Sequence, residues 1–166
     1  MSVLLVSCYE LGRQPFTIAS PWAQLEAAGF EVSGVDVALD DLVLDRDHRL
    51  IAISVPMHTA LRLGVALAAR IRAAQPQAHI CFFGMYASLN AAYLLGGHAD
   101  SVIGGEFEEA LVSLAKAVHA AKPGDDGASE ARIPGVTTRV DDDRPAAPVL
   151  RKLPFVVPCR DGLPPL

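Results

Sequence analysis

The sequence predicts a three-layer α/β fold, in which one parallel sheet is covered by helices on both faces. Short apolar runs alternate with longer stretches of helical periodicity, and this alternation occurs five times before residue 122. Apolar residues make up 51% of the 166 residues and charged residues 20%, which is enough apolar surface for one buried core. We expect a doubly wound, five-stranded sheet with the strand order 2-1-3-4-5.

The five predicted strands are mostly continuous apolar runs, as strands buried on both faces require. They are Val3 to Ser7, Glu31 to Asp36, Leu50 to Val55, His79 to Phe83 and Asp100 to Ile103. Each run ends near a turn residue or near the start of a predicted helix. Parallel strands of this kind need a crossover between them, and three stretches of the chain supply one as a helix, while a fourth helix follows the last strand.

The four predicted helices are Pro15 to Ala28, Thr59 to Ala74, Tyr86 to Leu95 and Glu106 to Ala121. Gly29 is placed to adopt the left-handed conformation that closes the first helix. The start of that helix stays open, because Pro21 can follow an N-cap at Ser20 or can kink a helix that begins near Pro15. Apolar side chains recur at helical spacing in the second helix and in the last one.

The composition changes after Lys122, and this predicts a domain boundary. Eight of the twelve prolines follow that residue, together with an acidic cluster at 141–143. We therefore expect one α/β domain over residues 1–122 and a proline-rich extension or linker over 123–166. Within the extension, Gly135 to Val140 is expected to form a short edge strand or a hairpin arm.

Charge and cysteine content exclude several classes of protein. A net charge of −5 and a pI near 5.4 provide no basic surface for a phosphate backbone, so nucleic acid is not an expected partner. Cys8, Cys81 and Cys159 are far apart and lack C-x-x-C spacing, which argues for reduced thiols rather than a disulfide framework or a zinc site. No apolar run reaches the roughly 18 residues of a membrane span, and we expect a cytoplasmic protein.

Ligands of a doubly wound sheet bind beyond the carboxyl ends of its strands, where four loops of this chain should meet. These loops are 7–15, 56–59, 84–88 and 104–108. The first loop has neither G-x-G-x-x-G nor G-x-x-x-x-G-K-S/T, which excludes the usual dinucleotide and P-loop sites. It also lacks the hydroxyl groups of a flavin phosphate loop and the clustered aspartates of a phosphoacceptor domain.

Ordinary structural roles compete with ligand binding at each of these loops. His58 or Thr59 can cap the following helix, and Met57 can pack against the core. Gly84 can let a flat ligand approach the backbone, or can simply ease the turn. The acids that follow Gly105 suit a helix N-terminus whatever the function.

Three segments carry a resemblance to a known family. The first is the segment Ser7-Cys8-Tyr9-Glu10-Leu11-Gly12, which aligns with a D-x-H-x-x-G motif that follows the first strand, and it keeps the glycine of that motif. Ser54 ends the third strand and Gly84 ends the fourth. The segment Asp100 to Glu108 is similar to D-x-V-x-x-G-E-x-E. Over about Ser2 to Ala121, the chain resembles the N-terminal cobalamin-binding domain of cobalamin-dependent radical SAM proteins.

The resemblance implies a flavodoxin-like module that binds cobalamin with no protein imidazole on cobalt, since Tyr9 replaces the histidine. Pro56 and Met85 replace a leucine and a glycine of the family pattern and narrow the space for the nucleotide tail. The cofactor-binding residues it implies are Tyr9, Glu10, Leu11 and Gly12 after the first strand, Ser54, Val55, Met57, His58 and Thr59 after the third, Gly84, Met85 and Tyr86 after the fourth, and Gly104, Gly105 and Glu106 after the fifth.

The partner implied by the resemblance is a C-terminal radical SAM domain that binds S-adenosylmethionine and a 4Fe–4S cluster through C-x-x-x-C-x-x-C. That cysteine motif is not in this sequence. We therefore expect a module that is non-catalytic by itself, in a protein that acts on a peptide or a small molecule. The alternative is a docking or structural domain of a radical SAM protein that has lost cobalamin. A free-standing enzyme ranks last, because no acid and base can be paired from the sequence.

Overall fold

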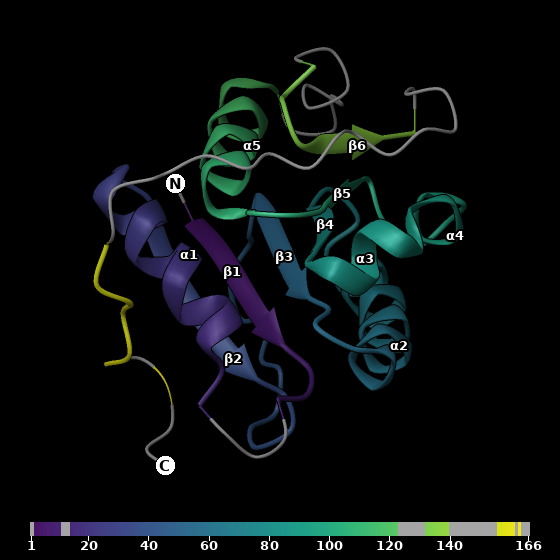
Figure 1. The fold of residues 1–166 in the computed structure, drawn as a ribbon, viewed down its shortest axis with the longest axis horizontal. Coiled ribbons are helices and arrows are strands. Elements are labelled where there is room, and N and C mark those ends of the chain that lie inside the picture. The colour runs from purple at the N-terminus through teal and green to yellow at the C-terminus, as the bar shows by residue number, and fades with distance from the viewer. Residues whose placement is uncertain (1, 11–13, 123–131, 140–155, 162, 164–166) are drawn as a thin grey trace.

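The computed structural model describes residues 2–10, 14–122, 132–139, 156–161 and 163. Its strands form one six-stranded sheet in the order β2-β1-β3-β4-β5-β6 (Figure 1). The strands are β1 (Ser2–Ser7), β2 (Glu31–Asp36), β3 (Leu50–Ser54), β4 (His79–Phe83), β5 (Ser101–Ile103) and β6 (Val136–Thr138). The first five are parallel and follow the predicted order, which confirms the doubly wound α/β fold.

The sheet has one strand more than the five that the sequence predicts. β6 is the short edge strand expected near Gly135, and it runs antiparallel to β5, with Ser101 opposite Thr138 and Ile103 opposite Val136. The three residues of β6 are all buried. The additional strand therefore covers an edge that β5 would otherwise leave with unpaired backbone groups.

Helices cover both faces of the sheet (Figure 1). On one face lie α1 (Phe16–Ala27) and α5 (Glu108–Ala120), and on the other lie α2 (His58–Ala74), α3 (Met85–Leu89) and α4 (Ala91–Leu95). Neighbouring strand residues point to opposite faces, so Leu5 and Phe83 pack with α1 and α5, while Val6 and Phe82 pack with α2. Full burial of each such side chain contributes about 1.5–3 kcal/mol.

Two predicted helices differ from the structure. The stretch Tyr86 to Leu95 is two short helices, because Asn90 leaves helical geometry at φ −116° and its side-chain amide donates a 2.7 Å hydrogen bond to the carbonyl of Tyr86. The last helix begins at Glu108 rather than Glu106, since Gly105 adopts φ +68° and the chain turns there. The sequence left open where α1 starts, and the structure shows that the helix begins at Phe16 and contains Pro21. Gly29 follows the helix with the expected positive φ of 89°.

Part of the proline-rich extension packs against the α/β domain. Besides β6, the segment 156–161 runs along α1, where the backbone N–H of Cys159 donates a 3.0 Å hydrogen bond to the carbonyl of Ala19. Leu163 is buried in the same apolar cluster as α1. In the described part of the chain, no helix is both long enough and apolar enough to span a membrane.

Candidate functional site

The predicted loops meet at one edge of the sheet, which we call the carboxyl edge: residues 9–10, 55–59, 84–86 and 104–106. Backbone hydrogen bonds hold these loops together. The N–H of Val55 donates to Phe83, and the N–H of Gly84 donates to Ile103, at 2.8 and 3.0 Å. The N–H of Tyr86 donates to the carbonyl of Val55 at 3.3 Å. The topology thus brings together the loops that the sequence predicted. Leu11 and Gly12 lie outside the described residues.

Four of the predicted site residues are buried beneath the carboxyl edge: Ser54, Val55, Gly84 and Gly104. Gly84 has φ +108°, and a Cβ there would lie 3.0 Å from the carbonyl oxygen of Val55. At Gly104 a Cβ would lie 2.6 Å from the Cβ of Ser88. Both glycines are therefore required by the close packing of the loops on each other.

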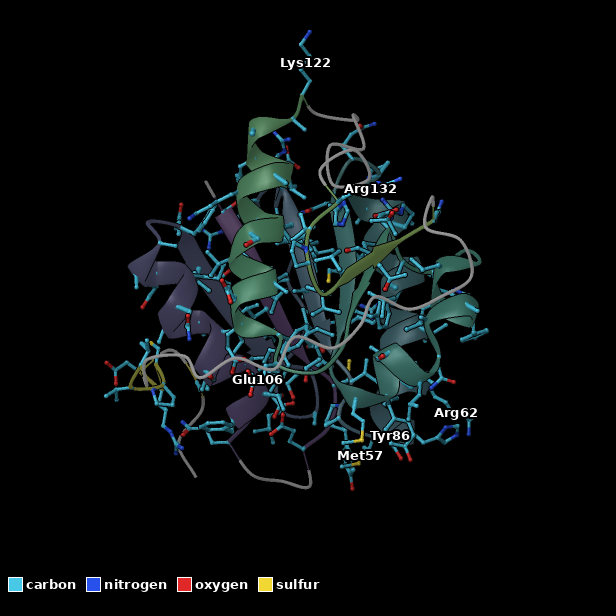
Figure 2. The ribbon with its side chains drawn as sticks, turned by 45° about the horizontal axis from the view of Figure 1, so that its top comes forward. Met57, Arg62, Tyr86, Glu106, Lys122 and Arg132 are labelled. Atoms are coloured by element: carbon cyan, nitrogen blue, oxygen red, sulfur yellow. The ribbon has the colours of Figure 1, made fainter. Side chains whose placement is uncertain are left out.

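The remaining described site residues reach the surface of the carboxyl edge. His58, Thr59, Met85, Gly105 and Glu106 are exposed, and Tyr9, Glu10, Met57 and Tyr86 are half-buried. Figure 2 shows Met57, at the N-cap of α2, and Tyr86, in the first turn of α3, at this edge, with Glu106 nearer the start of α5. Neither His58 nor Thr59 caps α2, because Met57 occupies the N-cap position and no side chain caps the helix. Their capping role is excluded, and both side chains are available to a ligand.

A chain of hydroxyl groups connects the carboxyl edge to α1. The hydroxyl of Ser54 donates a 2.7 Å hydrogen bond to Thr17, whose own hydroxyl donates to the carboxylate of Glu10. Burial raises the pKa of Glu10, and the hydrogen bonds from Thr17 oppose that shift. One turn further along α1, Ser20 donates a 2.8 Å hydrogen bond to Glu108 of α5.

Thr17 and Ser20 are not among the site residues predicted from the sequence, where Ser20 was considered only as an N-cap. Their spacing of three residues places both hydroxyls on one face of α1, and this was the signal in the sequence that could have indicated them. Their acidic partners lie on other elements, in the loop after β1 and at the start of α5. The pairing therefore depends on the assembled sheet.

A cavity of about 310 Å³ lies on the α2 face of the sheet, and we call it the α2 cavity. It is open to solvent on one side, and it is lined by α2, by the segment 37–42 after β2, and by Cys8 and Tyr9 after β1. Tyr9 is the predicted site residue that lines it. Burial raises the pKa of Cys8 to about 12, so this thiol stays protonated and is not a nucleophile at neutral pH.

Among the described residues, no three His, Cys, Asp or Glu side chains gather as a metal site.

Comparison with known proteins identifies a fold that the chain shares with a solved structure. No protein-family model matches the sequence, and no curated protein matches it. Among solved structures, the chain is similar to the radical S-adenosylmethionine methyltransferase TsrM from Kitasatospora setae, solved with tryptophan substrate and a SAM analogue bound. The TM-score is 0.68 at 22% identity, over 89% of this chain and 30% of that chain. The two chains share a fold, and this chain spans about a third of the length of TsrM.

Proposed function

We propose that this chain is a cobalamin-binding module of a radical SAM protein and is non-catalytic by itself. The observation that carries the proposal is the fold shared with a radical SAM methyltransferase over 89% of this chain. The similarity of Asp100 to Glu108 to the segment D-x-V-x-x-G-E-x-E of cobalamin-binding domains also supports it. The position of Met57 and Tyr86 at one edge of the sheet also supports it.

The proposed binding surface for the corrin ring is the carboxyl edge. Met85 is 68% exposed and Gly105 has no side chain, so the loops after β4 and β5 leave the edge uncovered. The aromatic rings of Tyr9 and Tyr86 are half-buried and offer apolar contact to a corrin. Bound cobalamin would supply a cobalt ion that carries a one-carbon group. The loop after β1 offers a phenol where a histidine ligand would stand, so we propose that cobalt has no imidazole from this loop.

The proposed partner is the C-terminal radical SAM domain of a longer protein, with its 4Fe–4S cluster and S-adenosylmethionine. This chain spans only 30% of TsrM, which leaves room for such a domain in a protein of similar size. Met85 and Leu89 expose 68% and 73% of their surfaces on α3, next to the carboxyl edge. We propose these two side chains as part of the contact with that domain.

A second candidate is a docking domain without cobalamin. The packing below the carboxyl edge favours it, because the Ser54 hydroxyl already donates to Thr17 and Gly104 is in close contact with Ser88. A nucleotide tail that entered between the loops at these positions would have to displace both contacts. The two candidates thus differ in whether the edge holds a cofactor.

Binding of hydroxocobalamin to the purified chain separates the candidates. If the proposal is correct, the cofactor elutes with the protein in gel filtration and its visible spectrum shifts. Met85→Arg on the carboxyl edge should weaken binding, whereas Ala92→Arg on an exposed position of α4 should not. Elution of all cobalamin apart from a folded protein would overturn the cofactor proposal and favour the docking domain.

A further inference from the structure

The α2 cavity has the volume of a small-molecule site. Ligand pockets begin at about 300 Å³, and an apolar cavity of about half that volume holds one benzene molecule. At about 310 Å³, the α2 cavity accommodates an aromatic ring with a short chain attached. It lies beside the carboxyl edge and shares Tyr9 with it, and its other lining residues lie outside that edge.

The walls of the α2 cavity are mainly apolar. Leu63 and Leu67 lie one turn apart on α2 and form one wall, and Val37 and Leu42 lie on the segment that faces them. The half-buried ring of Tyr9 adds an aromatic surface. Leu63 is 46% exposed, so part of this apolar surface is in contact with water when the cavity is empty. An apolar ligand would remove that surface from water, which favours binding.

The charged groups that line the α2 cavity are mostly acidic. Asp40 and Asp41 belong to the segment after β2, and Arg70 is the basic group that α2 contributes. The carboxylates outnumber the guanidinium, so a cation should be favoured over an anion of the same shape.

We propose that the α2 cavity binds a small hydrophobic amine, with an apolar body of about one ring and a positively charged end. The ring contacts Leu63, Leu67 and Tyr9, and the ammonium group lies near Asp40 and Asp41. Cys8 contributes a buried, protonated thiol to the wall, so binding is non-covalent. This site does not depend on cobalamin, and the two kinds of binding can be measured separately.

Titration of the isotope-labelled chain with phenethylamine, followed by NMR, tests the site. Amide signals of residues 37–42 and 63–70 should shift together and saturate. Phenylacetate has the same ring and the opposite charge, and it should bind about fivefold to tenfold more weakly, as expected for two solvent-exposed charge pairs. Absence of saturable shifts in these segments, or tighter binding of phenylacetate, would overturn the proposal.

Variants on α2 and on the acidic segment locate the ligand. Ala66→Trp places a large side chain in the lining of the cavity and should abolish phenethylamine binding, whereas Ala69→Trp, on an exposed position that does not line the cavity, should leave it unchanged. The double variant Asp40→Asn, Asp41→Asn should bring the affinity for phenethylamine close to that for phenylacetate. Unchanged binding in a folded Ala66→Trp variant, or a charge preference that survives the double variant, would refute the assignment.

Discussion

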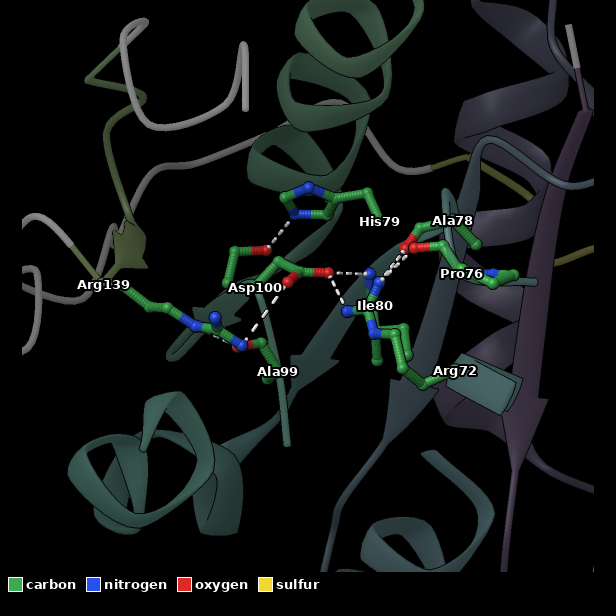
Figure 3. Close-up of polar contacts among 9 residues, drawn as sticks. Arg72, Pro76, Ala78, His79, Ile80, Ala99, Asp100 and Arg139 are labelled. Atoms are coloured by element: carbon green, nitrogen blue, oxygen red, sulfur yellow. Dashed lines mark hydrogen bonds and ion pairs between the residues drawn. The ribbon is translucent and has the colours of Figure 1, made fainter. Parts of the chain in front are cut away.

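Removal of the Asp100 carboxylate should destabilise the fold measurably. Asp100 precedes β5, and its carboxylate accepts a 2.8 Å hydrogen bond from the backbone N–H of Ile80 in β4 (Figure 3). It also pairs with Arg72 of α2 and, at 3.6 Å, with Arg139 beyond β6. One side chain therefore connects two strands, a helix and the end of the edge strand.

The expected magnitude follows from these contacts. A hydrogen bond to a charged acceptor contributes about 1.5–3 kcal/mol, and Asp100→Ala also leaves the N–H of Ile80 without its acceptor. The Arg72 side chain is 38% exposed, so that ion pair is screened and adds about 0.5–1 kcal/mol. The Arg139 pair is longer and half-exposed and adds little. We expect Asp100→Ala to lower the free energy of unfolding by about 3 kcal/mol.

Asp100→Asn should cost only about 1 kcal/mol, because an amide oxygen can still accept from Ile80. For a chain of this length, 1 kcal/mol corresponds to about 2–4 °C in Tm. Thermal denaturation followed by circular dichroism should thus show a fall of about 9 °C for alanine and about 3 °C for asparagine. The control is Asp41→Ala, which should leave Tm unchanged. Asp41 is exposed, and the described structure shows no hydrogen bond or ion pair for it. Equal shifts for alanine and asparagine, or no shift for either, would refute this account.

Three further predictions concern burial, packing and the proposed ligand. Burial lowers the pKa of His48 below its unfolded value of 6.5, so its contribution to stability is present above that value and is lost as pH falls toward the folded pKa. Denaturant titrations from about pH 7.5 to pH 5 should show this loss, and His48→Gln should reduce it. Gly104→Ala should cost about 1–3 kcal/mol of stability because of the contact with Ser88, and Ser88→Gly in the same chain should recover most of it. If hydroxocobalamin binds, Tyr9→His should change its visible spectrum by providing an axial imidazole.

Each of these predictions has a result that contradicts it. An identical pH dependence in the His48→Gln variant would show that other groups control acid stability. Additive effects of Gly104→Ala and Ser88→Gly would mean that the two positions do not contact each other as the structure shows. An unchanged spectrum, with cobalamin still bound to the Tyr9→His variant, would place residue 9 away from cobalt.

The strands were predictable because their sequences carry a strong local signal. A strand that is buried on both faces is mostly apolar, and β1, β3 and β4 each contain four consecutive apolar residues. The signal weakens when an element is short. β6 has three residues, and only its pairing with β5 shows that it belongs to the sheet. The break at Asn90 likewise depends on one side-chain hydrogen bond inside an otherwise helical pattern.

The aspartate of the segment that most resembles the cobalamin-binding family has a structural explanation in this chain. Its contacts with Ile80, Arg72 and Arg139 account for an acid at position 100 whether or not a cofactor binds. The same is true of Gly104, which packs against Ser88. The surface residues of the carboxyl edge, such as Tyr9 and Met85, therefore test the cofactor proposal more directly than these buried ones.

The sequence by itself determined the layers of this protein and the edge at which its loops gather. Apolar periodicity marks which side chains leave water, and parallel strands place their carboxyl ends on one side whatever the loops contain. The tertiary structure alone decided which side chains meet there: Ser54 with Thr17, Glu10 with α1, and the α2 cavity between α2 and the segment after β2. These contacts join residues far apart in the chain, and they exist only once packing has fixed the distances between elements.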